Sequence, residues 1–228
     1  MRSKTYTVIS LVVVSLLVAA CGSNSASATL SSKPPKQILN TSLTAMKSAK
    51  SVTLSGSINN SGTTVGVDLG LTSNGEASGS IVESGQKIDV VLLRSKDYVK
   101  APAGFWQASG HLSAVQATRI APDWVEVPSS LASSFSSLSI RSLSESLSTD
   151  NGVLSKAGSK TVDGDATVGV RSSKGGTLWV RSSGTPYPLA ITGSLNTRSI
   201  DVHFSKWNAT PAPKAPKGAL SATSLSAI

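Results

Sequence analysis

Residues that could bind a metal ion are few in this chain. A zinc site needs about three histidine, cysteine or carboxylate ligands placed together, and the sequence holds two histidines and one cysteine. His111 and His203 are far apart along the chain, and neither belongs to a His-x-x-x-His pair. The segment Asp163-Gly164-Asp165 lacks the further ligands of a calcium-binding loop and is typical of a turn. We therefore predict no metal site and no cofactor.

A serine nucleophile has equally little support. The chain has no Gly-x-Ser-x-Gly segment, the strained turn that presents the nucleophile in many hydrolases. The segment from Ser84 to Lys87 has the spacing of a Ser-x-x-Lys active site, but it lies in a predicted hairpin turn rather than at the start of a helix. No Lys-Thr-Gly segment accompanies it. We predict that the protein is not an enzyme.

The single cysteine, Cys21, follows a segment with the features of an export signal. Arg2 and Lys4 are basic, residues 8–20 carry no charge, and residues 18–20 are Val-Ala-Ala. The apolar segment is too short to span a bilayer as a helix. These residues resemble the lipobox of bacterial lipoproteins, which implies cleavage before Cys21 and a diacylglyceryl thioether on its sulfur.

We therefore predict that residues 1–20 are a lipoprotein signal peptide. The mature protein would be exported and anchored to the outer face of the cytoplasmic membrane by acyl chains, including palmitate, on Cys21. The alternatives are an ordinary signal peptide that ends in a cysteine, and a buried thiol. Lipidation is favoured because a lone cysteine in an exported protein has no disulfide partner, and two acyl chains hold a protein on a membrane where one binds only marginally.

Composition places limits on the partners and on the fold. The net charge is +9, but the basic residues are scattered and form no run with interleaved aromatics, so we predict no binding to nucleic acid. The charge would suit a surface close to anionic headgroups, or it would only keep the domain soluble. The length predicts one domain, and the few aromatics (4%) with many small and hydroxyl residues favour β-structure.

The order of predicted elements is helix, strands, helical insertion, strands. We expect a flexible tether at 21–35, an amphipathic helix at 36–50, and one domain over 36–207. Residues 101–150 are predicted to hold a short helix near 112–118 and one or two Ser-rich helices that contain Leu131, Phe135, Leu138, Leu143 and Leu147, with Ser129 or Ser130 as cap. The Pro-rich tail at 208–228 is predicted to be extended or disordered.

The predicted strands share an alternation of apolar and polar residues, which indicates an antiparallel sheet with one apolar face. The first group covers 52–58, 65–71, 77–82, 86–94 and 97–100, and the second group covers 153–157, 166–171, 176–181, 188–195 and 198–204. The inward positions are our candidates for the lining of an apolar cavity. They are Val65, Val67, Leu69, Leu71, Ile88, Val90, Leu92, Ile200, Val202 and Phe204.

Several segments carry a resemblance to a known family. They are Leu43-Thr44-Ala45-Met46, Ser51-Val52-Thr53-Leu54-Ser55-Gly56, Trp124-Val125-Glu126-Val127-Pro128, Val162-Asp163-Gly164, Gly176-Thr177-Leu178-Trp179-Val180, Pro186-Tyr187-Pro188-Leu189-Ala190-Ile191 and Phe204-Ser205-Lys206-Trp207. Their order along residues 36–210 resembles the LppX/LprG-type bacterial lipoproteins, which have a LolA-like fold. The resemblance implies an α+β fold: a strongly curved open antiparallel sheet, or half-barrel, with helices packed on its concave face around a cavity that takes lipid acyl chains.

The function implied by this resemblance is the binding of an acylated lipid or lipoglycan, which the protein carries or presents across the cell envelope. A membrane transporter is a possible partner, and we expect a monomer. An alternative is a non-catalytic surface binding or sensory module with a fully packed core and no lipid ligand. The two hypotheses differ in one measurable property, since a carrier copurifies with lipid and a packed scaffold does not.

Overall fold

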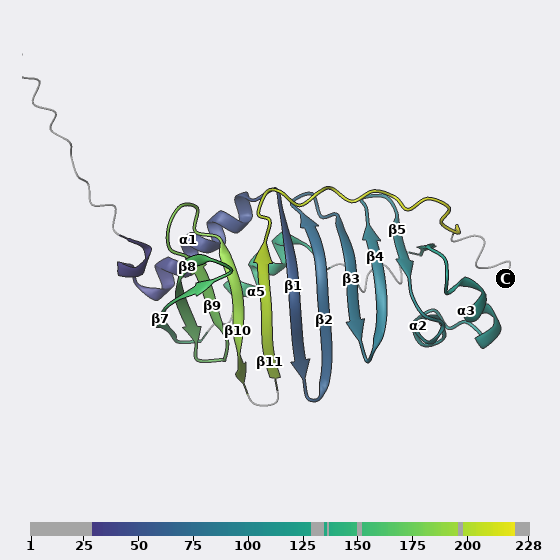
Figure 1. Cartoon of the computed structure of the whole chain (residues 1–228), viewed down its shortest axis with the longest axis horizontal. Helices are drawn as coiled ribbons and strands as arrows, with labels where there is room; N and C mark the ends of the chain where they lie inside the picture. Colours follow the sequence, from purple (N-terminus) through teal and green to yellow (C-terminus); the bar gives the residue numbers. More distant parts are fainter. Residues whose placement is uncertain (1–28, 129–134, 136, 150–151, 196–197, 222–228) are drawn as a thin grey trace, which may run out of the picture.

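An antiparallel sheet of eleven strands forms the body of the protein (Figure 1). The computed structural model describes residues 29–128, 135, 137–149, 152–195 and 198–221. Along the sheet the strands follow the order β6-β5-β4-β3-β2-β1-β11-β10-β9-β8-β7. Two meanders therefore meet at the centre, where β1 pairs with β11.

The predicted strands are present, mostly with small shifts of their ends, but β7 continues to Val162, whereas the prediction ended at residue 157. The first meander consists of β1 (Ser51–Asn60), β2 (Thr63–Thr72), β3 (Ala77–Glu83), β4 (Gln86–Leu92), β5 (Asp97–Lys100) and β6 (Val125–Val127). The second consists of β7 (Leu154–Val162), β8 (Asp165–Ser172), β9 (Thr177–Arg181), β10 (Pro188–Leu195) and β11 (Arg198–Ser205). The sequence pattern did not reveal β6 because three residues are too few for an alternation to be recognised.

Tight turns join neighbouring strands at three hairpins. Ser61-Gly62, Ser84-Gly85 and Asp163-Gly164 all have positive φ angles, as two-residue hairpin turns require. Ser84 therefore lies in a turn, as predicted, and so does the Asp163-Gly164 pair.

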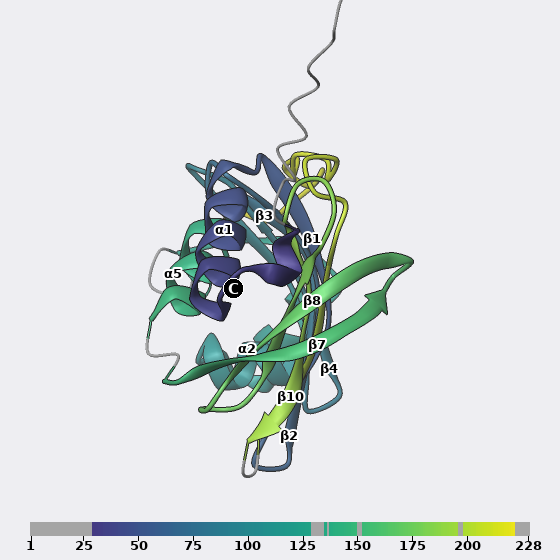
Figure 2. The same cartoon turned by 90° about the vertical axis from the view of Figure 1, so that its left-hand side faces the viewer.

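The helices cover one face of the sheet (Figure 2). They are the 3-10 helix η1 (Leu30–Ser32) and the α-helices α1 (Pro35–Ser48), α2 (Ala103–Ser109), α3 (Ala114–Ile120) and α5 (Ile140–Ser148). The short helix predicted near 112–118 is α3, which begins two residues later than predicted, with a capping box at Ser113, whereas α2 was not predicted. Ser139 caps α5, whereas Ser129, Ser130 and Leu131 lie outside the described residues.

The structure confirms the predicted class, an α+β fold with a curved, open antiparallel sheet. Leu54, Leu69 and Val90 are buried under the helices, while their strand neighbours Ser55 and Asp68 point to the opposite face, called the outer face here. This is the alternation that the sequence indicated.

Three glycines on the helix-covered face allow the strands to bend. Gly56, Gly79 and Gly193 have φ angles of 138°, 144° and 142°, a region that side chains other than glycine rarely adopt. A Cβ atom at Gly79 would lie 2.0 Å from the carbonyl oxygen of Asp68, and one at Gly56 would lie 2.1 Å from that of Asp201. Glycines at such positions permit the kinks that curve a sheet.

The C-terminal tail runs extended along one end of the strands, from β11 toward β6 (yellow in Figure 1). Near its start, the hydroxyl groups of Thr53 and Thr210 are hydrogen-bonded at 2.9 Å. Near its end, the Leu220 N–H donates to the carbonyl of Trp124, and the Glu126 N–H donates to the carbonyl of Leu220, both at 2.8 Å. Residues 208–221 are therefore attached to the sheet at both ends and are not a free tail.

The N-terminal segment also contacts the domain before the predicted boundary at residue 36. Leu30 is buried against α1, and the Lys156 ammonium group donates to the Ser31 carbonyl at 2.6 Å. Cys21 and the predicted signal peptide lie outside the described residues. Within the part of the chain that is described, no helix is both long and apolar enough to cross a membrane.

Candidate functional site

The helix-covered face buries two large clusters of apolar side chains. The first, called the packed core here, joins β1–β6 and β11 to α2 and α3 and includes Trp106 and Ile120. The second, called the α1 cluster, joins α1 to β8 and β9 and includes Ile38 and Met46. Side chains between them, such as Leu143 of α5, contact both clusters.

A cavity of about 70 Å³ lies within the α1 cluster. Aliphatic side chains from several elements form most of its wall. These side chains are Leu39 of α1, Leu147 of α5, Leu154 of β7, Val170 of β8, Leu178 of β9 and Ile191 of β10. Gly175 and Gly176 also border the cavity and contribute no side chain to fill it. The inner space is therefore suited to an aliphatic group rather than to a polar one.

A wider depression of about 380 Å³ adjoins this cavity on the side of the N-terminal segment. The two spaces share Leu39 and Leu154 in their walls. The rim is formed by the ends of α1 and α5, with Pro34, Lys36 and Ser148. The site is thus aliphatic inside and mixed at the mouth, where Lys36, Asn40 and Ser148 add polar groups to an otherwise apolar lining. This arrangement can hold an amphiphile, with its chain inside and an anionic or polar headgroup outside.

A second region of the helix-covered face stays partly open near the β1–β2 hairpin. Ile58 is 39% exposed although it faces the helices, and its neighbours on the adjoining strands, Val65 and Ile200, are only half-buried. Val67 and Ile81, which pair with each other, are also half-buried. Half-covered aliphatic side chains on a core-facing surface provide apolar area that a chain-like ligand could cover.

The ten residues predicted to line a cavity all belong to strands of the helix-covered face, but most of them pack tightly. Seven are buried in the packed core: Leu69, Leu71, Ile88, Val90, Leu92, Val202 and Phe204. The other three, Val65, Val67 and Ile200, are half-buried. Their role in ligand binding stays a prediction.

The residues around the observed cavity come from other parts of the sequence. Leu39, Leu147, Leu154 and Val170 were not among the candidates, because their clustering depends on how α1 and α5 rest on the second meander. One signal was available. The pair Gly175-Gly176 stands immediately before an apolar strand, where two missing side chains leave room beside Leu178.

The residues that could bind a metal lie apart from this cavity. The His203 Nδ1 atom is 2.8 Å from an Asp163 carboxylate oxygen, and its Nε2 atom is 3.3 Å from an Asp201 oxygen. This exposed group of polar side chains joins β11 to the turn after β7. Among the described residues, no group of three or more histidine, cysteine, aspartate or glutamate side chains is placed to hold a metal ion.

No protein-family model and no curated protein matches the sequence. Solved structures do resemble the fold. LprF from Mycobacterium bovis has 18% identity and a TM-score of 0.57, with 81% of this chain and 97% of that chain covered. The lipoprotein LppX from Mycobacterium tuberculosis has 19% identity and a TM-score of 0.49, with 79% and 98% covered. The likeness to LprF shows that the chain has the fold predicted from its sequence motifs, that of the LppX/LprG-type lipoproteins.

Proposed function

We propose that the protein is an exported, membrane-anchored lipoprotein that binds an acylated lipid on the helix-covered face of its sheet. The observation that carries this proposal is the aliphatic cavity beneath α1 and α5, which adjoins a mouth with both apolar and polar residues. Burial of an acyl chain there is favourable by about 0.8 kcal/mol per methylene group. Such binding needs shape and apolar surface rather than a polar sequence motif.

The position of the mouth suits exchange with a bilayer. Pro34 and Pro35 border the mouth, and the predicted lipidated residue, Cys21, precedes them by a short segment. That segment of about 13 residues spans at most roughly 45 Å when fully extended. The anchor would therefore keep the mouth close to the headgroups, where Lys36 is attracted to anionic lipids.

The size of the cavity predicts how a ligand would enter. A space of about 70 Å³ accommodates only a few methylene groups, because one water molecule in the liquid already occupies about 30 Å³. A longer acyl chain would have to displace α1 or α5 from the sheet, or extend toward the half-buried side chains near Ile58. Binding would thus select a more open arrangement of the helices.

A Trp substitution where the cavity meets its mouth tests this proposal. Leu154→Trp would fill the passage between the two spaces, whereas Val153→Trp places the same indole at an adjacent position that is 77% exposed. We expect lipid in the parent protein and in the Val153→Trp control, and about tenfold less in Leu154→Trp. The measurement is native mass spectrometry of protein purified from membranes without detergent, with circular dichroism to confirm folding.

Two results would contradict the lipid-binding proposal. One is a parent protein that never carries lipid, which would favour the packed scaffold. The other is a folded Leu154→Trp variant that retains the full amount of lipid, which would place the ligand elsewhere.

The anchor is tested separately from the cavity. We expect Cys21→Ser to abolish labelling by a palmitate analogue and to release the protein from membranes, because the acyl chains on Cys21 supply the attachment. Unchanged labelling of this variant would contradict lipidation at Cys21.

We also propose a biological use for the lipid-binding site. The protein would carry its lipid across the cell envelope and deliver it to a membrane transporter.

A further inference from the structure

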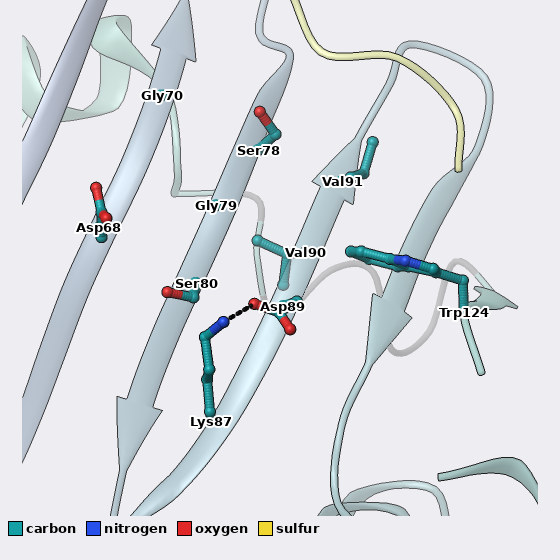
Figure 3. A pocket seen from close by; sticks show the side chains of 10 residues that line it. All are labelled: Asp68, Gly70, Ser78, Gly79, Ser80, Lys87, Asp89, Val90, Val91 and Trp124. Atoms are coloured by element: carbon teal, nitrogen blue, oxygen red, sulfur yellow. Dashed lines mark ion pairs between the residues drawn. The ribbon is translucent and has the colours of Figure 1, made fainter. Parts of the chain in front are cut away.

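The outer face of the sheet carries a second depression, a groove of about 380 Å³ over β2, β3 and β4 (Figure 3). The groove is open above the sheet because the residues at its base, Gly70, Ser78 and Ser80, are small. Three charged residues, Asp68, Lys87 and Asp89, also line the groove. The groove is on the face opposite the helices, so it is separate from the cavity beneath α1.

The strand register explains how these side chains come together. Asp68 pairs with Ser80, and Ser80 pairs with Asp89, so a carboxylate stands on either side of a serine hydroxyl in one cross-strand row. Neighbouring strands lie roughly 5 Å apart, which places the two carboxylate-bearing positions roughly 10 Å apart. The next row contains Gly70 and Ser78, which leave space above the sheet.

Trp124 closes one end of the groove with an aromatic surface. Figure 3 shows its indole ring extending toward Val90 and Val91 of β4. Its backbone is fixed because its carbonyl accepts the Leu220 N–H at 2.8 Å. The side chain is half-buried, and its indole N–H has no hydrogen-bond partner among the described residues. A half-exposed indole offers an apolar ring and an N–H donor to a ligand with both apolar and polar groups.

The charges in the groove restrict the class of ligand. Lys87 and Asp89 form an ion pair of 2.8 Å, Lys100 is in register with Asp89 on the same face, and Asp68 is exposed on β2, so positive and negative charges balance around the groove. Without an excess of positive charge, the groove does not attract anions such as phosphate or nucleic acid. An acyl chain would remove water from the carboxylates without replacing their hydrogen bonds, which is unfavourable.

We propose that this groove binds neutral sugar rings of a glycan. A sugar ring has hydroxyl groups along its edge and C–H groups on its faces. Carboxylates accept hydrogen bonds from hydroxyl groups, serine hydroxyls donate and accept, and the lysine ammonium donates. The electron-rich face of Trp124 attracts the C–H groups. Asp68 and Asp89 thus bind ring hydroxyls while Trp124 contacts a ring face.

The C-terminal tail contributes to this site by fixing its borders. At the Gly70 end, a Cβ atom on Gly70 would lie 2.7 Å from the Thr210 methyl group, so the tail rests directly on the glycine. At the other end, Leu220 holds Trp124. The tail therefore crosses the end of β2 and continues to the strand β6 next to Trp124 (Figure 1). This gives the tail a role in glycan binding.

The first experiment locates binding with the protein's four tryptophans. The mature chain with Cys21→Ser would be labelled with 5-fluorotryptophan and titrated with hexasaccharides of glucose, galactose, mannose and arabinose up to about 10 mM. We expect at least one neutral hexasaccharide to shift the ¹⁹F signal of Trp124 and to leave the Trp106 signal unchanged. A hyaluronan hexasaccharide, which carries carboxylates, should shift neither.

Calorimetric titrations of variants then test the assigned contacts. We expect Trp124→Ala to weaken binding about tenfold or more, with a smaller loss in Trp124→Phe, which retains an aromatic face. Asp68→Ala should weaken binding several-fold, and Asp123→Ala is the matched control. It removes an exposed carboxylate next to Trp124 in the chain but outside the groove, and it should bind like the parent.

A second titration, with vesicles that contain digalactosyldiacylglycerol, distinguishes a polysaccharide from a glycolipid headgroup as the source of the sugar. Trp124-dependent binding of free hexasaccharide assigns the groove to a polysaccharide, and binding to the vesicles alone assigns it to a glycolipid headgroup. The proposal is overturned if neither probe shifts the Trp124 signal, or if Trp124→Ala and Asp68→Ala both bind like the parent. Leu154→Trp, which blocks the apolar cavity, should retain glycan binding, so this proposal can fail or succeed independently of lipid binding.

Discussion

The two halves of the helix-covered face bury the same kinds of aliphatic side chain but fill the space between helix and sheet differently. In the packed core, α2 supplies Trp106, which is 1% exposed and donates its indole N–H to the Ala101 carbonyl at 3.0 Å. In the α1 cluster, leucines from α1 and α5 meet the second meander beside the turn residues Gly175 and Gly176, and about 70 Å³ stays open. The comparison teaches that the volume of the side chains facing each other, from the helices and from the sheet with its turns, decides where a cavity remains.

The largest expected effect comes from placing a charged side chain in the packed core. Leu69 is 2% exposed, so Leu69→Asp would bury a carboxylate without a partner and lower the free energy of unfolding by at least about 4 kcal/mol. The neighbouring change Asp68→Asn, on the outer face, should alter it by no more than about 0.5 kcal/mol. Urea unfolding followed by circular dichroism measures both. Equal effects would show that the strand faces are assigned wrongly.

The second prediction concerns the close approach of strands in the packed core. Gly79→Ala places a Cβ atom 2.0 Å from the Asp68 carbonyl oxygen at a φ angle of 144°, so it should destabilise the protein by about 2–4 kcal/mol. Gly66→Ala on β2 is the control, because its nearest contact would be an ordinary 3.6 Å. The control should be neutral or slightly stabilising. Thermal unfolding of the pair measures the difference, and a neutral Gly79→Ala would refute the kink at this position.

A pair of small-to-large changes compares the two halves directly. Val90→Leu adds a methylene group to the packed core, where Val90 is fully buried, and should cost about 1–3 kcal/mol. Val170→Leu adds the same group beside the open cavity and should change the stability by less than about 0.5 kcal/mol. Chemical unfolding measures both variants. If Val170→Leu were as costly as Val90→Leu, the α1 cluster would be packed as tightly as the rest.

The smallest effect depends on pH and probes the edge of the packed core. Burial raises the pKa of Asp97 above its ordinary value, while the hydrogen bond from the Leu93 N–H opposes this shift. The folded state therefore holds the Asp97 proton more tightly than the unfolded state, and the stability falls as the pH rises from about 3.9 through the raised pKa.

Asp97→Asn retains an acceptor for the Leu93 N–H and removes the charge. We expect the stability gained by this variant to grow as the pH rises through that interval and then to level off. Parallel unfolding experiments from pH 3 to pH 7 follow the trend. A constant difference between variant and parent over this range would contradict the assigned cause.

Local pattern and packing contributed differently to what could be predicted. The alternation in β2 and β4 placed Leu69 and Val90 on the buried face, and Pro35 marked the start of α1. Residues 101–127 were harder, because α2, α3 and β6 are short and their periodicity is weak. Most of the residues predicted to line a cavity proved to be tightly packed core residues. Alternation indicates which side chains are buried, but it does not indicate whether a space remains between them.

The sequence by itself determined the sheet, its faces and its meander order, because strand period and turn residues act over a few neighbouring positions. It also carried the predicted lipidation motif before Cys21. Only the tertiary structure decided that Leu39, Leu154 and Val170 surround a cavity, and that the tail fixes Trp124 at one end of a groove that Asp68 and Asp89 also line. These groupings join residues about a hundred positions apart in the sequence, such as Leu39 with Leu154 and Trp124 with Leu220, and their spacing depends on how the helices and the tail rest on a curved sheet.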